Sequence, residues 1–346
     1  MVKGTFDGKY DIVKFALSFF VVAIHSCLLP KILYPWLRIA VPLFFMISAY
    51  FLFLKLQSIP RADHRRILIQ YILRNGKLYL FWFVVLIPVT LYIRYDLWFS
   101  TSVWNGILVF FQNLLFGSTF GASWYLTASI IGVIIVYLLS HKGSVGWLCA
   151  VSVIAFSAVT FFSTYMSLLP QESAVYVFYR GYERFFGNPV LSFPAALVWI
   201  TAGKAFAEGW IPLRKLWENR IVLVISCVAL YLEWQFATDL TGSRNNDSYF
   251  MLLPVCISVF GCLQKLPPVN CRFLLHLRRA STVIYVSHVS AITILGFLFR
   301  HFWHIDLPLL LFVSSIACGV VLYGCIAYIT SRYPQSKLAK LLSLAC

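Results

Sequence analysis

Charged side chains are scarce in this sequence, and acidic ones are the scarcest. Only 12% of the 346 residues are charged, against about 25% in a typical soluble domain, and Asp and Glu together number 12. Hydrophobic residues make up 61%, and the mean hydropathy is +0.83. This composition excludes a water-soluble globular chain of this length, and we expect an integral membrane protein.

Several catalytic, redox and metal-binding motifs are also missing. None of the nine cysteines forms a C-x-x-C pair, so no disulfide framework and no metal site is expected. Phosphate-loop ATPase, α/β-hydrolase and zincin motifs (G-x-x-x-x-G-K-[ST], G-x-S-x-G and H-E-x-x-H) are absent. The net charge of +16 lies in short segments between apolar runs, which indicates membrane topology and no nucleic-acid partner.

A membrane-spanning helix needs about 20 mostly apolar residues. Ten runs are candidates: 11–29, 37–55, 73–95, 123–140, 147–164, 190–207, 219–237, 248–263, 280–299 and 306–329. We therefore predict an all-α polytopic membrane protein with about ten transmembrane helices, eight being the alternative. No small-residue cleavage site follows the first run, so we expect it to remain in the protein as a span. The stretch 103–116 is short enough for an interfacial or re-entrant helix, and 165–189 is too polar to cross.

The basic residues test this topology, because cytoplasmic loops are enriched in Lys and Arg. With the N-terminus in the cytoplasm, 21 of the 28 Lys and Arg residues fall on that side. The seven on the other side are Lys31, Arg38, Arg94, Arg180, Arg184, Arg244 and Arg300. We predict that both termini are cytoplasmic and that 1–346 is a single membrane-embedded domain. The outer loops 96–122 and 165–189 are candidates for a lid or an acceptor groove.

Ionisable residues inside a span are costly and indicate function. Lys14 and His25 lie eleven residues apart on the first span, about 16 Å along the axis and almost three whole turns. Both side chains should therefore face one side of the helix, the Lys at the cytoplasmic mouth and the His deeper. The alternative is a snorkelling Lys and a His that bonds a neighbouring helix.

Four more basic or imidazole side chains are candidates for the same site. Arg74 and Lys77, three residues apart at the start of the third predicted span, are spaced to clamp phosphates or to act only as topology signals. Arg38 opens the second span near the outer surface. His288 is a second intramembrane His, for which a direct role and a core position are equally open.

Weaker candidates have structural explanations. We expect helix packing for Pro42, Ser48 and Ala49, and an aromatic belt for Trp124 and Tyr125. Glu233, Asp239 and Asp247 are further candidates, for acceptor-site carboxylates, and Asn246-Asp-Ser248 is a short glycosylation pattern.

Four stretches together resemble the acyltransferase 3 family of bacterial membrane proteins. They are Asp11-Ile-Val-Lys14 with His25-Ser26, the segment Arg38 to Tyr50, Arg74-x-x-Lys77, and the segment Ser281 to His288. Two departures are Ala49, where the family usually has Gly, and Lys77, where Arg is more usual. An Arg at the latter position would bind a phosphate in bidentate fashion, which a Lys does not.

The resemblance implies an O-acyltransferase in the bacterial cytoplasmic (inner) membrane. It would move an acyl group, usually acetyl, from cytoplasmic acyl-CoA (acetyl-CoA as donor co-substrate, no bound cofactor) to a hydroxyl of a surface glycan or lipid-linked saccharide. His25 would be the general base, Lys14, Arg74 and Lys77 would bind the donor, and Arg38 and His288 would contact the substrate. A glycan or lipid-intermediate transporter or flippase is the main alternative, and a non-catalytic sensor or assembly partner is a third.

Overall fold

The chain folds into helices and connecting loops, as its long apolar runs predict. The computed structural model describes residues 7–99, 102–212, 214–243 and 246–346, and no strand occurs among them. Lys3 and Arg244, which were counted in the topology argument above, lie outside the described residues.

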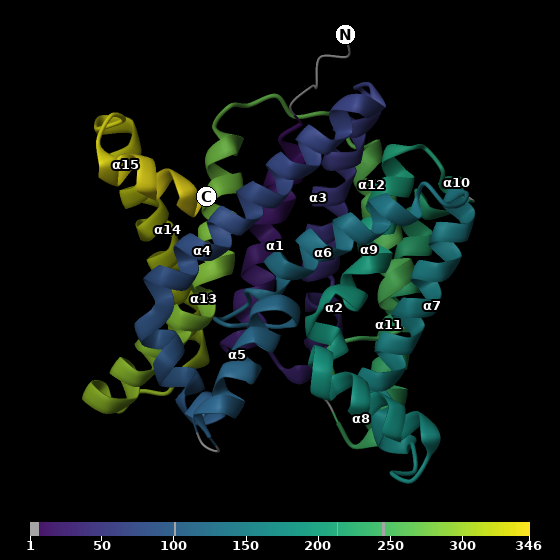
Figure 1. Ribbon diagram of the computed structural model, residues 1–346, viewed down its shortest axis with the longest axis horizontal. Coiled ribbons are helices and arrows are strands. Elements are labelled where there is room, and N and C mark those ends of the chain that lie inside the picture. The colour runs from purple at the N-terminus through teal and green to yellow at the C-terminus, as the bar shows by residue number, and fades with distance from the viewer. Residues whose placement is uncertain (1–6, 100–101, 213, 244–245) are drawn as a thin grey trace. The chain divides into compact units, whose positions relative to one another are not determined.

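The helices follow one another with short connections (Figure 1). They are α1 (Lys9–His25), α2 (Tyr34–Leu37), α3 (Ala40–Gln57), α4 (Arg61–Phe99), α5 (Val103–Phe116), α6 (Trp124–Leu139), α7 (Val145–Thr164), α8 (Ala174–Phe186), α9 (Phe193–Ala207), α10 (Arg214–Trp217), α11 (Arg220–Thr241), α12 (Leu252–Lys265), α13 (Leu274–Trp303), α14 (Pro308–Arg332) and α15 (Lys337–Leu342).

Each of the ten predicted spans coincides with a helix, but the helices differ in length. Among the described residues, six helical segments are long and apolar enough to cross a membrane, and a seventh results if the pair α8–α9, bent by 43°, is one span. The helices α1, α6 and α12 have only 17, 16 and 14 residues. The protein is thus a multi-pass membrane protein, while the count of ten and the cytoplasmic termini stay predictions. The stretch 103–116 forms the short helix α5, as expected.

The described chain divides into two compact units. The first contains 30–68 and 127–268, and the second contains 7–29, 69–126 and 269–346. The predicted single membrane domain stays a prediction.

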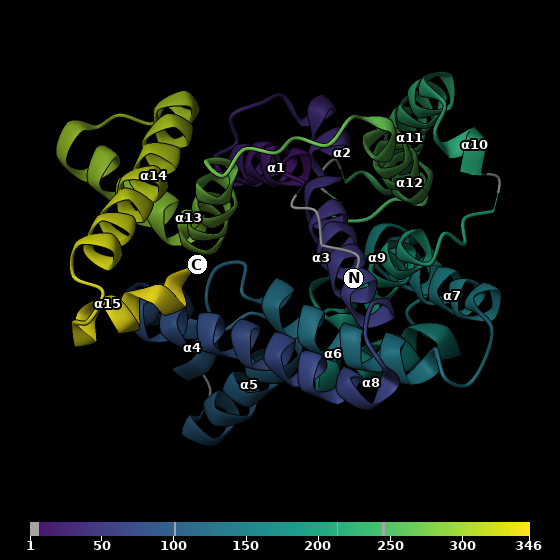
Figure 2. The same cartoon turned by 90° about the horizontal axis from the view of Figure 1, so that it is seen from above.

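In the first unit, α3 packs closely along α9 (Figures 1 and 2). Gly203 of α9 lies against the backbone of Met46 and Tyr50, and a Cβ added there would lie 2.9 Å from the Cβ of Ala49. Ala49 is therefore a packing residue, as predicted, and the two small side chains set the helix separation. Pro42 lies in the first turn of α3, where its missing N–H costs no helical hydrogen bond.

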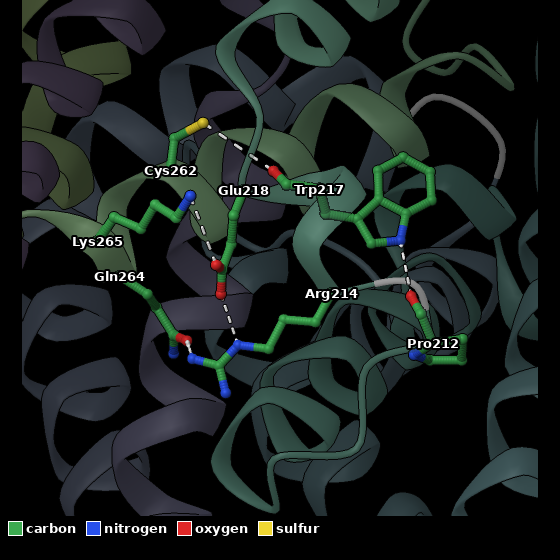
Figure 3. A network of polar contacts seen from close by, with 7 residues as sticks. All are labelled: Pro212, Arg214, Trp217, Glu218, Cys262, Gln264 and Lys265. Carbon is green, nitrogen blue, oxygen red and sulfur yellow. Dashed lines mark hydrogen bonds and ion pairs between the residues drawn. The ribbon is translucent and has the colours of Figure 1, made fainter.

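A polar network joins α10 to α12 in the same unit (Figure 3). The Glu218 carboxylate accepts from Nε of Arg214 at 2.5 Å and pairs with Nζ of Lys265 at 3.7 Å. Arg214 also donates to the side-chain carbonyl of Gln264, at 3.4 Å. Two of the predicted cytoplasmic cations therefore share one carboxylate, which ties the short helix α10 to its neighbour.

In the second unit, α1 and α13 lie side by side (Figure 2). They run in the same direction, because Asp11 contacts Arg278 near their starts and His25 contacts His288 farther along. The N–H of Gly8 donates to the carbonyl of Val269 at 2.8 Å, just before the two helices begin. On its other side α13 packs on α14, where Gly319 lies against Ile284. Helices α1 and α13 come from opposite ends of the sequence and carry three of the six predicted site residues, Lys14, His25 and His288.

Candidate functional site

The first end of the α1–α13 pair is held by an ion pair whose carboxylate is buried. Asp11, which is 2% exposed, accepts from Nε of Arg278 at 2.6 Å and from Nη2 at 3.1 Å. Lys14 lies one turn beyond Asp11, within electrostatic reach of Arg278 and of Arg74 of α4. Three cations from three helices thus gather around one carboxylate, which leaves an excess of positive charge.

Two of the predicted donor-binding residues lie on α4. The helix begins at Arg61, before the predicted span, so Arg74 and Lys77 lie well inside the helix. Arg74 approaches Lys14, as a shared site requires. Both Arg74 and Lys77 are exposed, one helical turn apart, and therefore accessible to a ligand.

Further cations extend this cluster. Arg279, next to Arg278 on α13, bonds the hydroxyl of Tyr323 on α14. Arg279 and Arg74 both lie within electrostatic reach of Cys346, whose segment is anchored by the indole of Trp82 donating to the carbonyl of Ala345 at 3.0 Å. The sequence indicated Arg278 and Arg279 only as topology signals, because nothing in it reveals that they lie beside α1.

The second end of the pair holds two imidazoles. The rings of His25 and His288 are 5.0 Å apart between centroids, tilted by 50°. His25 is the last residue of α1, where the sequence predicted a longer span, and it is exposed. A helix-ending turn follows, in which Leu28 donates to the carbonyl of Ala23 and Cys27 takes a φ of 54°.

His288 differs from His25 in its surroundings. It is 1% exposed, and its Nδ1 lies 2.5 Å from the backbone carbonyl oxygen of Tyr285. Its Nε2 is buried and has no hydrogen-bond partner among the described residues. The Tyr285 ring contacts both His288 and Tyr125 of α6, at 5.8 and 5.3 Å between centroids. Tyr125, predicted in an aromatic belt, thus joins the ring cluster of the site.

The last part of the predicted outer loop 96–122 packs against α13 near these rings. Gly121, with a φ of +39°, lies beside Val289, and a Cβ there would be 3.3 Å from the Val289 Cβ. Thr119 is fully buried and hydrogen-bonds the Tyr79 hydroxyl at 2.5 Å. This stretch therefore packs on α13 at Val289, the residue that follows His288.

Arg38 belongs to the other unit and is held there by Asp247, with Nη1 2.7 Å from Oδ1. The short helix before it is fixed by Trp36, whose indole donates to the carbonyl of Cys227 at 3.1 Å and stacks on Tyr231. Because Asp247 keeps a side chain that is 40% exposed, this ion pair is open to a polar ligand.

Glu233, a weak candidate acceptor-site carboxylate, has a structural role. It accepts the N–H groups of Phe250 and Met251, both at 2.7 Å, immediately before α12. It also accepts from the hydroxyl of Tyr165 at 3.0 Å, and burial followed by this carboxylate raises the pKa of Tyr165. Glu233 is thus a cap for the N-terminus of α12. Asp239 is exposed on α11.

The two ends of the α1–α13 pair are about 15–21 Å apart, given ten residues of α13 and fourteen of α1 at 1.5 Å per residue. Cations suited to phosphates lie at one end and imidazoles suited to proton transfer at the other. This arrangement fits an elongated ligand with an anionic head and a reactive tail.

Comparisons with known proteins show the family to which the chain is related. The profile of an acyltransferase domain, acyltransferase 3, matches residues 7–329. A curated protein from Enterococcus faecalis called amino-acid racemase is 24% identical over an alignment of 356 residues, which covers 94% of this chain. The chain spans 47% of that relative's length. No solved structure matches the chain.

Proposed function

Since the chain belongs to the acyltransferase 3 family, and is thus a membrane acyltransferase, we propose that it moves an acetyl group from acetyl-CoA to a glycan hydroxyl. The donor comes from the cytoplasm and the acceptor is a cell-envelope glycan or a lipid-linked saccharide. The proposed location is the bacterial cytoplasmic membrane.

One observation carries the proposal. Lys14, Arg74 and Arg278 gather at one end of α1–α13, and His25 and His288 at the other. The cations would bind the phosphates of CoA, with Lys77 as a further contact one turn along α4. The pantetheine arm of CoA would then carry the thioester along the helices to the imidazoles.

His25 would act as the general base. Its unprotonated ring nitrogen takes the proton of the acceptor hydroxyl while the oxygen attacks the thioester carbonyl carbon. The carbon–sulfur bond then breaks, and the CoA thiolate takes the proton from the imidazolium. An ester and free CoA result, with no other reactant. Arg38 would orient the acceptor, and His288 would shape the pocket.

The test uses purified protein in liposomes with radiolabelled acetyl-CoA and an extract of envelope glycans. We expect label in the glycan with the wild type and none with His25→Ala, at equal amounts of membrane-inserted protein. His141→Ala is the matched control, because this exposed His lies two residues after α6 and bonds the Tyr137 carbonyl at the end of that helix.

Two results would count against the proposal. Full transfer by His25→Ala would exclude His25 as the base. If the wild type neither transfers, hydrolyses nor binds acetyl-CoA, the transporter alternative gains support, and Lys14, Arg74 and Lys77 are then topology signals.

A further inference from the structure

The proton on neutral His288 has a fixed place. A backbone carbonyl only accepts hydrogen bonds, so the contact between Nδ1 of His288 and the Tyr285 oxygen requires the proton on Nδ1. Nε2 then carries the lone pair. This atom is buried and unpartnered among the described residues, and an unsatisfied buried acceptor is costly. Such a group needs a functional explanation.

His25 is the nearest imidazole to that lone pair. The ring centroids are 5.0 Å apart, a separation at which two ring nitrogens that face one another are within hydrogen-bond distance. His25 is the last residue of α1, and its side chain is exposed. A base in that position needs a second group to fix its tautomer and direction.

We propose that His288 is the positioning residue for His25: its Nε2 accepts a hydrogen bond from a ring N–H of His25. The other His25 nitrogen then keeps its lone pair and faces the acceptor hydroxyl. This inference rests on the proposed function and deepens it, because it assigns His288 to the base and not to the substrate.

The proposed pair also defines which imidazole holds the proton during transfer. When His25 takes the hydroxyl proton, the imidazolium donates to Nε2 of His288, which stabilises the cation without moving a second proton. His288 stays neutral, because two cations this close repel one another and His288 is buried. Tyr285 on α13 contacts His288, and Tyr125 on α6 contacts Tyr285 in turn. The cations of Lys14 and Arg278 lie at the far end of α1 and α13.

Two variants of similar size separate this role from simple packing. In His288→Asn the amide NH₂ replaces Nδ1–H and keeps the bond to the Tyr285 carbonyl, but nothing replaces Nε2. In His288→Gln the amide oxygen reaches the place of Nε2 and restores an acceptor. We expect the kcat of acetyl transfer to fall about 10–100-fold in the Asn variant, and the Gln variant to recover most of it.

A second measurement needs no turnover. Diethyl pyrocarbonate modifies neutral imidazoles, and its rate at His25 against pH, followed by peptide mass spectrometry, gives the pKa of His25. An acceptor at Nε2 stabilises the His25 cation, so its loss in His288→Asn should lower that pKa by about one unit. His288→Gln should restore the wild-type profile.

The outcomes are distinguishable. If the wild type transfers no acetyl group, the proposed function fails, and the modification profile still decides the positioning role. Identical His25 profiles in all three proteins would overturn that role, whatever the activities. Full transfer by His288→Asn would overturn it as well.

Discussion

The guanidinium of Arg278 donates to both carboxylate oxygens of Asp11, a residue 267 positions earlier in the sequence. The pair fixes the start of α1 against the start of α13. The carboxylate is almost fully buried, whereas the Arg278 side chain is 36% exposed. Water therefore screens the pair on one side, and the positive charge of Arg278 remains available to a ligand.

Asp11→Asn should destabilise the protein. The change leaves the Arg278 charge without its partner, so we expect the free energy of unfolding to fall by about 1–3 kcal/mol. This is less than for a fully buried pair, because water screens Arg278. Thermal unfolding in detergent measures the change in stability. Glu183→Gln is the control, since it breaks the ion pair with Arg180, whose side chain is 62% exposed. If both variants unfold at the same temperature, the Asp11 pair does not stabilise the helix pair.

Lys14→Ala and Arg74→Ala should weaken donor binding. Each removes one cation from the predicted phosphate site, so we expect KM for acetyl-CoA to rise about tenfold with little change in kcat. Raising the salt concentration should reduce the difference from the wild type. Arg66→Ala is the matched control, an exposed cation on the same helix as Arg74. An equal KM increase in the control would mean that general surface charge is responsible.

Gly203→Leu should separate α3 from α9. Its Cβ alone would come within 2.9 Å of the Ala49 Cβ, and the remaining side chain has no space between the helices. We expect about 1–3 kcal/mol of destabilisation and lower yields of folded protein, measured by size-exclusion chromatography and thermal unfolding. Gly181→Ala has no heavy atom within 4 Å of its Cβ and should be neutral or stabilising by up to about 1 kcal/mol. If Gly181→Ala destabilised the protein more than Gly203→Leu, the described packing of α3 on α9 would be contradicted.

Glu233→Gln should affect stability more than catalysis. The neutral amide has one acceptor oxygen for three donors, the N–H groups of Phe250 and Met251 and the Tyr165 hydroxyl. We expect the free energy of unfolding to fall by about 1–2 kcal/mol, a value typical for the loss of a helix cap. Michaelis constants for both substrates should stay unchanged, as in the exposed control Asp239→Asn. A selective rise in the acceptor KM would instead return Glu233 to the acceptor site.

The sequence predicts the helices well because apolar side chains must be buried in lipid or protein wherever they occur. It predicts their ends less well. The helix α4 begins at Arg61, twelve residues before the predicted span, because its polar first turns lie outside the apolar run. Helix α1 ends at His25, although Cys27 to Leu29 are apolar, because the chain turns at Cys27 with a positive φ. Hydropathy alone predicts neither the start of α4 nor the end of α1.

The candidate site is predicted in part. The spacing of Lys14 and His25 gives their places on one helix, and α1 is continuous between them. The approach of His288 to His25 and the Arg278 ion pair depend on how α1 and α13 pack, which residues so far apart in sequence do not reveal. The capping role of Glu233 depends on a third segment, the N-terminus of α12. Tertiary contacts decide these roles.

The pairing of α1 with α13 also constrains biosynthesis. During translation α1 enters the membrane long before residues 274–303 leave the ribosome, so Asp11 meets Arg278 only after most of the chain has been inserted. His25 and His288 also come together only at this late stage of insertion. A chain arrested before α13 therefore holds all of its early helices but lacks both the Arg278 ion pair and the imidazole pair.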